Sequence, residues 1–551
     1  TNEFAFDSLM HSLMTNFSSY YPAATGTNVL SSATKATTLT LRIGPGVYET
    51  HGDATEGGQT LAWAPRHGWR IVGSGKNKTT LKAVHLRPGQ TRSVIGCYST
   101  GIKGVGAYHN FEISDLTIDA NLHEGETNYQ MRAAMCMGFV GSNVQVRRVK
   151  AKNAGTTIGG WEVMHIQMHN FGADMDGTHN LILEDCDIVQ AQVGNAYKSG
   201  MISICGHYGS SGQMHYYNNV VVRNCYIDGA GHDGNLPVNR ALYGVWDRGR
   251  FGVGIGGARN ALVEDNLVMN VGTGYYIDSI SLHDLKVRNN HFRNVAFGFD
   301  MQLFESFALT NRLIDTLSFE GNLVELDPRL FPVKDTWGTI GRRYGFRTLG
   351  NQQGPREYGF NSIVLRENTF RFTDGAAPEP SVIGHCGSFQ GVRTAQVISN
   401  AFNGPLLPWT WENQDAYLAT QADILDSTQP PPVTASGNTW QDGSICEPYP
   451  YVLDTSLPRP TVIAGQEVVF DTPSIHGAPA TVAWGMPAES PIGSDGKFRW
   501  RTTPSDAGVY VVSFYANSER RSDPRRTLIT VLPAYPVSDP RWFSAGLSGY
   551  W

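Results

Sequence analysis

The sequence has little charge, and none of it is gathered into a positive cluster. Asp, Glu, Lys and Arg make up only 17% of the 551 residues, and the formal net charge is -6. Proteins that bind nucleic acids or anionic membranes usually present dense Lys and Arg patches. We therefore expect neither nucleic acid nor membrane as a partner. The chain also lacks an apolar run of the roughly 18 residues that a spanning helix needs.

Cysteine is scarce, and no pair has the spacing of a metal site or a redox motif. Because the number of cysteines, seven, is odd, at least one thiol stays unpaired if disulfides form within the chain. We expect several of them to be small buried apolar residues. The sequence thus predicts no metal and no cofactor.

The chain begins with Thr1 and not with Met. This start suits removal of an export signal. We expect a bacterial protein that is secreted or periplasmic.

A segment of alternating residues that ends in Asn or Cys recurs seven times in the middle of the chain. Its last residues are 24 to 46 positions apart, so the strand register is fixed while the loops vary, as in a solenoid. Strands of successive coils lie about 4.8 Å apart, so the Asn and Cys side chains should form a ladder. The copies are Asn180–Cys186, Asn219–Cys225, Asn260–Asn266, Asp284–Asn290, Thr316–Asn322, Ser362–Asn368 and Thr394–Asn400.

The repeats and the segments Leu41–Glu49, Trp69–Leu81 and Ile113–Asp119 together resemble the pectate-lyase-like superfamily of right-handed parallel β-helices. The resemblance covers roughly residues 38 to 445. It implies an all-β fold with a right-handed parallel β-helix over 38–450. It does not imply one reaction, because the superfamily contains lyases, hydrolases, epimerases, transferases and phage tailspikes.

The two ends of the chain have different patterns. Residues 1–37 include Phe4–Phe17, whose helical spacing predicts a cap on the solenoid. Residues 455–535 contain short, regularly spaced strands and are similar to the bacterial immunoglobulin-like domains appended to exported enzymes. Residues 536–551 form an aromatic tail that we expect to pack against another surface.

A second strand, starting at a glycine, follows each repeat. Aligning these strands on Gly160, Gly200, Gly244, Gly274, Gly298 and Gly345 places the second and fourth residues outward. Aromatic rings beside charged groups form a surface suited to sugars. The second-position column reads Glu162, Ile202, Trp246, Tyr276, Asp300 and Arg347, and the fourth reads Met164, Ile204, Arg248, Asp278, Gln302 and Leu349. The predicted substrate-binding residues of these columns are Glu162, Trp246, Tyr276, Arg347, Arg248 and Gln302, and His165 and Arg240 join them.

Asp278 and Asp300 lie on adjacent coils, offset by two residues. This diagonal relation separates Cβ atoms by about 7 to 8 Å, within the range of roughly 5 to 9.5 Å used by glycosidase carboxylate pairs. We predict a catalytic pair without assigning the acid. The alternative is that these carboxylates only pair with Arg248 or Arg347 on the surface.

An insertion before the third of these strands supplies further candidates. His232, Asp233, Arg240, Asp247 and Arg250 could overhang the groove, and Asp233 and Asp247 join the predicted catalytic residues. The alternative for Asp233 is turn chemistry, because Asp-Gly pairs form turns. By register Asp247 should point inward, where it would need a partner such as Arg240.

Upstream, a run that is rich in His and Asp could hold a cation or assist catalysis. It contains His165, His169, Asp174, Asp176 and His179. Asp174 and Asp176 lack the other ligands of an EF-hand loop, so an Asx turn is the better interpretation and Ca²⁺ the alternative. Two further histidines, His207 and His283, are expected to be structural.

The leading hypothesis is an enzyme that cleaves glycosidic bonds in a poly- or oligosaccharide by hydrolysis, or by a related intramolecular transfer. The first alternative is a lyase acting on a uronate-containing glycan, with Arg248, Arg347 or Lys198 as base and a cation on the uronate. The second is a non-catalytic glycan-binding adhesin or tailspike-like protein.

Overall fold

The computed structural model describes most strands of the chain and leaves several connecting segments undescribed. The described residues are 5–16, 39–51, 63, 68–84, 93–96, 108–121, 135–139, 141–154, 163–169, 178–189, 199–208, 214–229, 251–278, 282–295, 297–302, 312–326, 342–349, 358–372, 383–389, 392–402, 410–412, 433–440, 451–453, 456–475, 478–484, 486, 492–506, 508–515, 525–532 and 534.

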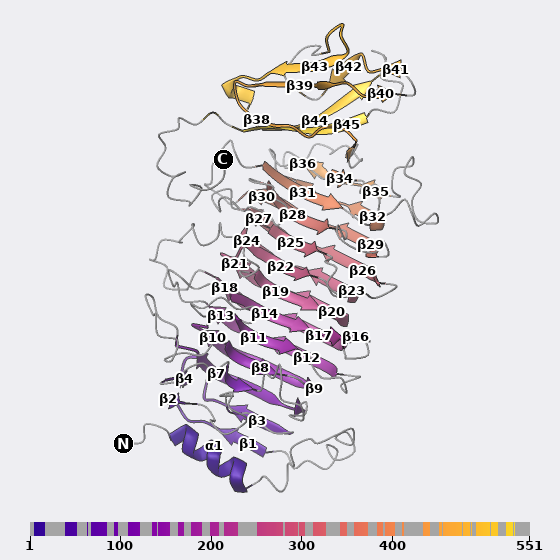
Figure 1. The fold of residues 1–551 in the computed structure, drawn as a ribbon. Coiled ribbons are helices and arrows are strands. Elements are labelled where there is room, and N and C mark those ends of the chain that lie inside the picture. Colours follow the sequence, from indigo (N-terminus) through magenta and orange to yellow (C-terminus); the bar gives the residue numbers. More distant parts are fainter. Residues whose placement is uncertain are drawn as a thin grey trace.

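The predicted β-helix is confirmed: parallel strands stack coil upon coil along most of the molecule (Figure 1). One face carries the longer strands, each in register with the equivalent strand of the next coil. They are β1 (Leu39–Arg42), β3 (Trp69–Val72), β7 (Glu112–Asp119), β10 (Val144–Lys152), β12 (Thr178–Glu184), β17 (Tyr217–Arg223), β20 (Ala258–Glu264), β23 (Leu282–Arg288), β26 (Arg312–Glu320), β29 (Tyr358–Arg366), β32 (Val392–Ile398) and β35 (Val433–Ser436).

A second face carries short strands that follow the long ones after a turn. They are β2 (Gly46–Thr50), β4 (Thr79–Ala83), β13 (Asp187–Val189), β18 (Tyr226–Asp228), β21 (Leu267–Met269), β24 (His291–Val295), β27 (Leu323–Leu326), β30 (Thr369–Phe372), β33 (Ala401–Phe402) and β36 (Thr439–Trp440).

The third face is a separate parallel sheet, called here the 11-stranded sheet. In chain order its strands are β5 (Ser93–Gly96), β8 (Met135–Phe139), β11 (Val163–His169), β14 (Ser199–Cys205), β19 (Phe251–Gly256), β22 (Thr273–Asp278), β25 (Phe297–Gln302), β28 (Arg342–Leu349), β31 (Ile383–Phe389), β34 (Thr410–Glu412) and β37 (Tyr451–Leu453). Two-stranded pairings at the edges join β6 (Tyr108–His109) to β9 (Gly141–Ser142) and β15 (His207–Tyr208) to β16 (Met214–His215).

The predicted Asn and Cys ladder runs inside the turn between the long and short strands. Asn290 shows the pattern: its Nδ2 donates to the carbonyl oxygen of Val263 at 2.9 Å, and its backbone N donates to Asn322 Oδ1 at 2.9 Å. The same pairing of Asn side chains continues through Asn368, Asn400 and Asn438, all buried. Each amide thus satisfies backbone groups that the turn would leave unpaired.

Two cysteines continue this ladder toward the N-terminus. The backbone N of Cys225 donates a hydrogen bond to Asn266 Oδ1 at 2.9 Å. Its thiol sulfur lies 3.9 Å from the carbonyl oxygen of Leu183. Cys186 faces the carbonyl oxygen of Val146 at 3.5 Å in the same way. A thiol fits the same space as the amide, although it is a weaker donor and acceptor, so Cys can take the place of Asn in the repeat.

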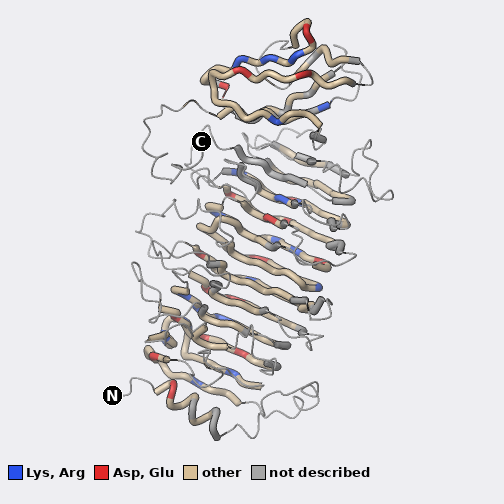
Figure 2. Tube along the Cα trace, in the orientation of Figure 1, with Lys and Arg blue, Asp and Glu red and all other residues tan. Residues whose placement is uncertain are grey.

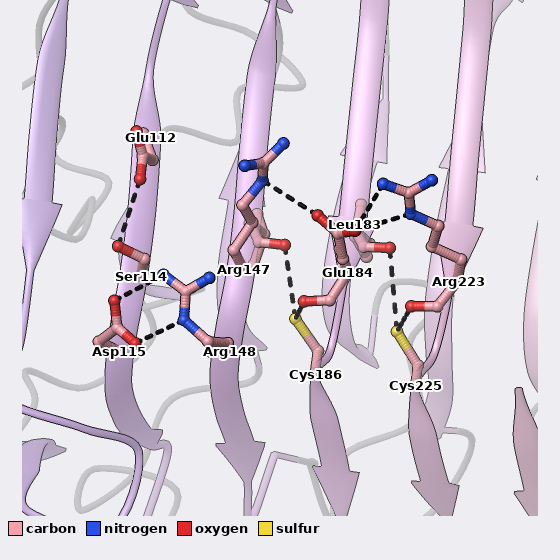
Figure 3. A network of polar contacts seen from close by, with 11 residues as sticks. Glu112, Ser114, Asp115, Arg147, Arg148, Leu183, Glu184, Cys186, Arg223 and Cys225 are labelled. Carbon is pink, nitrogen blue, oxygen red and sulfur yellow. Dashed lines mark hydrogen bonds and ion pairs between the residues drawn. The ribbon is translucent and has the colours of Figure 1, made fainter.

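The outside of the long-strand face carries charges of alternating sign. Register places Arg147, Glu184, Arg223, Glu264, Arg288, Glu320 and Arg366 in one column. Figure 3 shows Glu184 between Arg147 and Arg223, at 3.2 and 2.5 Å. Both signs recur along the whole stack (Figure 2). Opposite charges on neighbouring strands avoid the repulsion that like charges would cause.

The expected N-terminal helix is present as α1 (Ala5–Asn16), which lies across the open end of the β-helix (Figure 1). Phe6 and Met10 are buried in the main core. Asp7 accepts hydrogen bonds from the Thr50 hydroxyl, from His51 N at 2.8 Å and from Trp63 Nε1 at 2.6 Å. These contacts fix the helix over the first coil.

A second, smaller unit follows the last coil and has its own core. One sheet contains β38 (Thr461–Ile463), β42 (Val482–Trp484), β44 (Gly508–Tyr515) and β45 (Arg525–Leu532), and β39 (Glu467–Asp471) pairs with β43 (Lys497–Arg501). Short β40 (Ser474–Ile475) and β41 (Ala478–Pro479) and the 3-10 turn Pro504–Asp506 complete it. Phe498 of β43 packs against Phe470 of β39 and against Phe514 of β44 in the four-stranded sheet. The arrangement is a small β-sandwich; its immunoglobulin-like character stays a prediction.

Candidate functional site

The outer surface of the 11-stranded sheet carries the column that the sequence predicted at β22, β25 and β28. Tyr276 pairs with Asp300, and Asp300 pairs with Arg347. Two residues further along the same strands, Asp278 pairs with Gln302. The predicted diagonal relation between Asp278 and Asp300 is therefore correct at the level of strand register.

The predicted strand at Gly244–Arg248 is wrong. The strand between β14 and β22 is β19, whose Val253 pairs with Ile202 on one side and with Tyr275 on the other. Val253 and Ile255 enter the core with no exposed surface, so this segment supplies the inward alternation that the coil requires. The sheet order therefore contradicts the alignment on Gly244. Trp246, Asp247 and Arg248, like Asp233 and Arg240, lie outside the described residues.

The alignment also slips in the two preceding coils. Gly200 pairs with Met164 and not with Gly160, and Ile202 falls in line with the inward Tyr275. Ile202 and Ile204, which were expected to face outward, are therefore core residues. A glycine is a weak anchor for register, because one residue of slip reverses every side chain. The outward places belong to Gln167 and Ser203, which pair with each other.

His165 lies in β11, away from the outer surface. It is fully buried, and its Nε2 accepts a hydrogen bond from the backbone N of Ala154 at 3.4 Å. That environment is that of a core histidine and not of a substrate contact. Glu162 and the Asp174 and Asp176 pair lie outside the described residues.

Asp300 and Arg347 form a two-point ion pair at the centre of the candidate site. Arg347 Nε donates to Asp300 Oδ1 at 2.8 Å, and Arg347 Nη2 donates to Asp300 Oδ2 at 2.7 Å. The side chains are 0% and 2% exposed for Asp300 and Arg347. The predicted alternative, a pairing of Asp300 with Arg347, is therefore present, but the pair is buried and not on a solvated surface.

Aromatic rings surround this pair on the same side of the sheet. The Arg347 guanidinium lies over the Phe297 ring, 4.6 Å from its centroid. The rings of Phe251 and Tyr276 lie 5.7 Å apart and form an apolar pair separate from the main core. Asp300 thus pairs with the guanidinium of one neighbouring strand and lies in register with Tyr276 of the other.

Sequence reasoning missed Phe251 and Phe297, although a signal for both was present. Each directly precedes the glycine of its strand, and register places them in one column with Thr273 between them. Tyr344 precedes Gly345 in the same way and pairs with Phe297. An aromatic residue just before a strand glycine would have identified this column.

For Asp278 and Gln302 the structure gives the backbone register alone, as the last residues of β22 and β25. Within the described ranges no group of three His, Cys, Asp or Glu residues is placed to hold a metal ion. In the same ranges, no helix is both long and apolar enough to cross a membrane. The chemistry that the structure describes at the site is that of the Asp300 carboxylate, the Arg347 guanidinium and aromatic rings.

The stacked sheets and the internal Asn ladder define a parallel β-helix protein, and a family model agrees with that fold over part of the chain. The family model described as "Right handed beta helix region" matches residues 149–322. No curated protein matches the chain.

Several solved structures are similar to this chain at low identity. The N-terminal fragment of bacteriophage phi29 gene product 12 is 11% identical, with 84% of this chain and 78% of that chain covered and a TM-score of 0.43. The A-module of the Azotobacter vinelandii mannuronan C-5 epimerase AlgE6 is 12% identical, with 75% and 93% covered and a TM-score of 0.34. DFA-IIIase from Arthrobacter chlorophenolicus A6 in complex with DFA-III is 11% identical, with 81% and 94% covered and a TM-score of 0.37.

Proposed function

We propose that the protein is a carbohydrate-active enzyme that cleaves glycosidic bonds at the outer surface of the 11-stranded sheet, by hydrolysis or a related intramolecular transfer. The observation that carries the proposal is the column of Tyr276, Asp300 and Arg347, with Asp278 one diagonal step away. That step corresponds to a Cβ separation of about 7 to 8 Å. Glycosidase carboxylates work at roughly 5 to 9.5 Å.

The contacts of Asp300 suggest which catalytic role each of the two carboxylates would have. Both of its oxygens accept hydrogen bonds from Arg347, which is the arrangement of an ionised carboxylate. An ionised carboxylate serves as nucleophile or general base, and the remaining role, protonation of the leaving oxygen, falls to Asp278.

The rings beside the pair support a sugar as the ligand. Phe251, Tyr276 and Phe297 are buried on the outer side of the sheet, in contact with one another or with Arg347. Aromatic rings pack on the apolar faces of sugar rings, while charged groups bind the hydroxyls.

The same contacts weigh against the lyase alternative at this position. A lyase base must accept a proton, whereas the Nε and Nη2 donors of Arg347 are both directed at Asp300. Lys198 and Arg248, the other basic candidates, lie outside the described residues.

Glycan binding without cleavage is the second candidate, and one observation favours it. Asp300 has no exposed surface, as expected of a carboxylate that maintains the shape of a binding surface and does not touch the substrate. An adhesin or tailspike-like protein would need only such a surface.

The deciding experiment incubates the purified protein with a panel of neutral and uronic-acid polysaccharides while following reducing ends and ultraviolet absorbance together. New reducing ends without absorbance are expected. Absorbance that rises with the reducing ends would indicate β-elimination. Binding without either signal would favour the second candidate.

On an active substrate, Asp278→Asn should lower the rate by about 100- to 10,000-fold, the range found when a general acid or base is lost. Asp265→Asn is the matched control: it makes the same change at an exposed turn residue with φ of 55°, and its rate should equal that of the wild type. Equal rates for both variants would remove Asp278 from the mechanism.

A further inference from the structure

A second polar cluster lies near the start of four successive long strands, just after the turn that leads from the 11-stranded sheet to the long-strand face. It consists of Tyr216, Arg259, His283 and Asp315, called here the corner cluster. Tyr216 directly precedes β17, and the other three lie in β20, β23 and β26. Register pairs Arg259 with His283 across neighbouring coils.

The contacts within the corner cluster form a chain. His283 Nδ1 lies 2.5 Å from Asp315 Oδ2, and His283 Nε2 lies 3.3 Å from the Tyr216 hydroxyl. The edge of the His283 ring meets the Tyr216 ring, with 5.1 Å between centroids. The Arg259 guanidinium lies over the Tyr216 ring, 4.2 Å from its centroid. Asp315 and Tyr216 thus fix the imidazole while the tyrosine ring supports the guanidinium.

Arg259 differs from its neighbours on the same face. Arg147, Arg223 and Arg288 are each bound to a glutamate in a neighbouring coil. Within the part of the chain that the structure describes, Arg259 has the Tyr216 ring as its contact and no carboxylate at ion-pair distance. Its side chain is exposed. A guanidinium placed on an aromatic ring keeps its planar fork of donors available for an anion in that plane.

The corner cluster is close to the proposed cleavage site along the chain. Arg259 is three residues beyond Gly256, the last residue of β19, and the register of β19 with β22 places Gly256 beside Asp278. Three residues span at most about 11 Å. His283 is five residues beyond Asp278. A glycan extending past the ends of β19 and β22 would reach Arg259.

We propose that the corner cluster is a subsite for an acidic group on the glycan, either the carboxylate of a uronic acid or an ester sulfate. Arg259 binds the anion through its guanidinium fork, and His283 and the Tyr216 hydroxyl border it. This inference rests on the proposed function for its substrate class, but the binding it describes is measurable without cleavage. It assigns an acidic polysaccharide as the substrate, which the carboxylate pair alone does not.

Direct binding of three polysaccharides tests the subsite: polygalacturonate, a sulfated galactan and a neutral galactan, each measured by affinity electrophoresis with the full chain. The wild type should bind one of the acidic polymers more tightly than the neutral one. Arg259→Gln should weaken that binding about tenfold, which is the effect of losing one charge-assisted contact. It should leave the binding of the neutral polymer unchanged. The acidic polymer that responds identifies carboxylate or sulfate.

Lys286→Gln is the matched control, because Lys286 is an exposed cation on the same strand as His283. An equal loss for Arg259→Gln and Lys286→Gln would overturn the subsite and leave only general charge attraction. Cleavage of neutral glycans without preferential acidic binding would overturn the subsite and keep the proposed function. Arg259-dependent acidic binding without cleavage of any glycan would keep the subsite and overturn the cleavage proposal.

Discussion

Replacing Arg347 by Met removes one partner of the ion pair at the centre of the candidate site. Asp300 would remain with no exposed surface and would lose two hydrogen bonds of 2.8 and 2.7 Å. Removing one partner of a buried ion pair costs about 3 to 5 kcal/mol. Arg347→Met should therefore lower the free energy of unfolding by that amount.

The second step of this prediction is a rescue. Adding Asp300→Leu to Arg347→Met removes the remaining carboxylate and replaces the pair with apolar side chains of similar size. Such replacements are often close to neutral, so the double variant should recover most of the lost stability, to within about 1 to 2 kcal/mol of the wild type. It should nevertheless lack cleavage activity, because Asp300 is gone.

Urea denaturation followed by far-ultraviolet circular dichroism measures these free energies for the wild type, both single variants and the double variant. Arg288→Met is the control, since Arg288 pairs with Glu264 while 49% of its side chain is exposed. Exposed pairs contribute about 0 to 1 kcal/mol. A loss for Arg347→Met no larger than for Arg288→Met, or a double variant as unstable as the sum of the single ones, would refute the reasoning.

Three further predictions concern the β-helix itself. Cys225→Asn should raise the free energy of unfolding by about 1 kcal/mol, because an amide there would extend the Asn ladder to Cys186 N; a lower urea midpoint would contradict this. Burial alone would raise the pKa of Glu325, but hydrogen bonds from His291 and Arg371 outweigh burial and lower it below the ordinary 4.5. The stability that this carboxylate contributes is present above that value and is lost as the pH falls through the lower folded pKa, so the urea midpoint of Glu325→Gln should depend less on pH in this acid range. Asp7→Asn should weaken the contacts of α1 with Trp63 and speed proteolysis near the N-terminus, whereas Leu9→Ala, at a residue 42% exposed, should not.

The repeat itself could be predicted because a solenoid uses one local rule many times. Each copy ends in Asn or Cys, and the buried amide at Asn290, Asn322 or Asn368 performs the same task in its own coil. An error in predicting one coil does not affect the prediction of distant coils, since each coil contacts mainly its neighbours. The helix α1 was predictable for a similar reason, since its apolar spacing is local.

The site was predictable only in part. At Tyr276, Asp300 and Arg347 the alignment on glycine gave the correct column. Before β19 a long insertion offered a competing glycine, Gly244, and the alignment chose it. Alternation with a period of two contains no information on which of two glycines begins the strand.

By itself the sequence determined the fold class, the ladder and the order of the strands, because each depends on residues close together in one coil and on their repetition. Tertiary structure decided which side chains meet across coils. Stacking alone brings Arg347 onto Asp300 and Phe297, 47 and 50 residues apart in the chain, and removes the ion pair from water. It also leaves Arg259 on Tyr216 without a carboxylate among the described residues, while its neighbours are paired. Contacts of this kind depend on loop lengths that differ from coil to coil, so no periodic pattern in the chain records them.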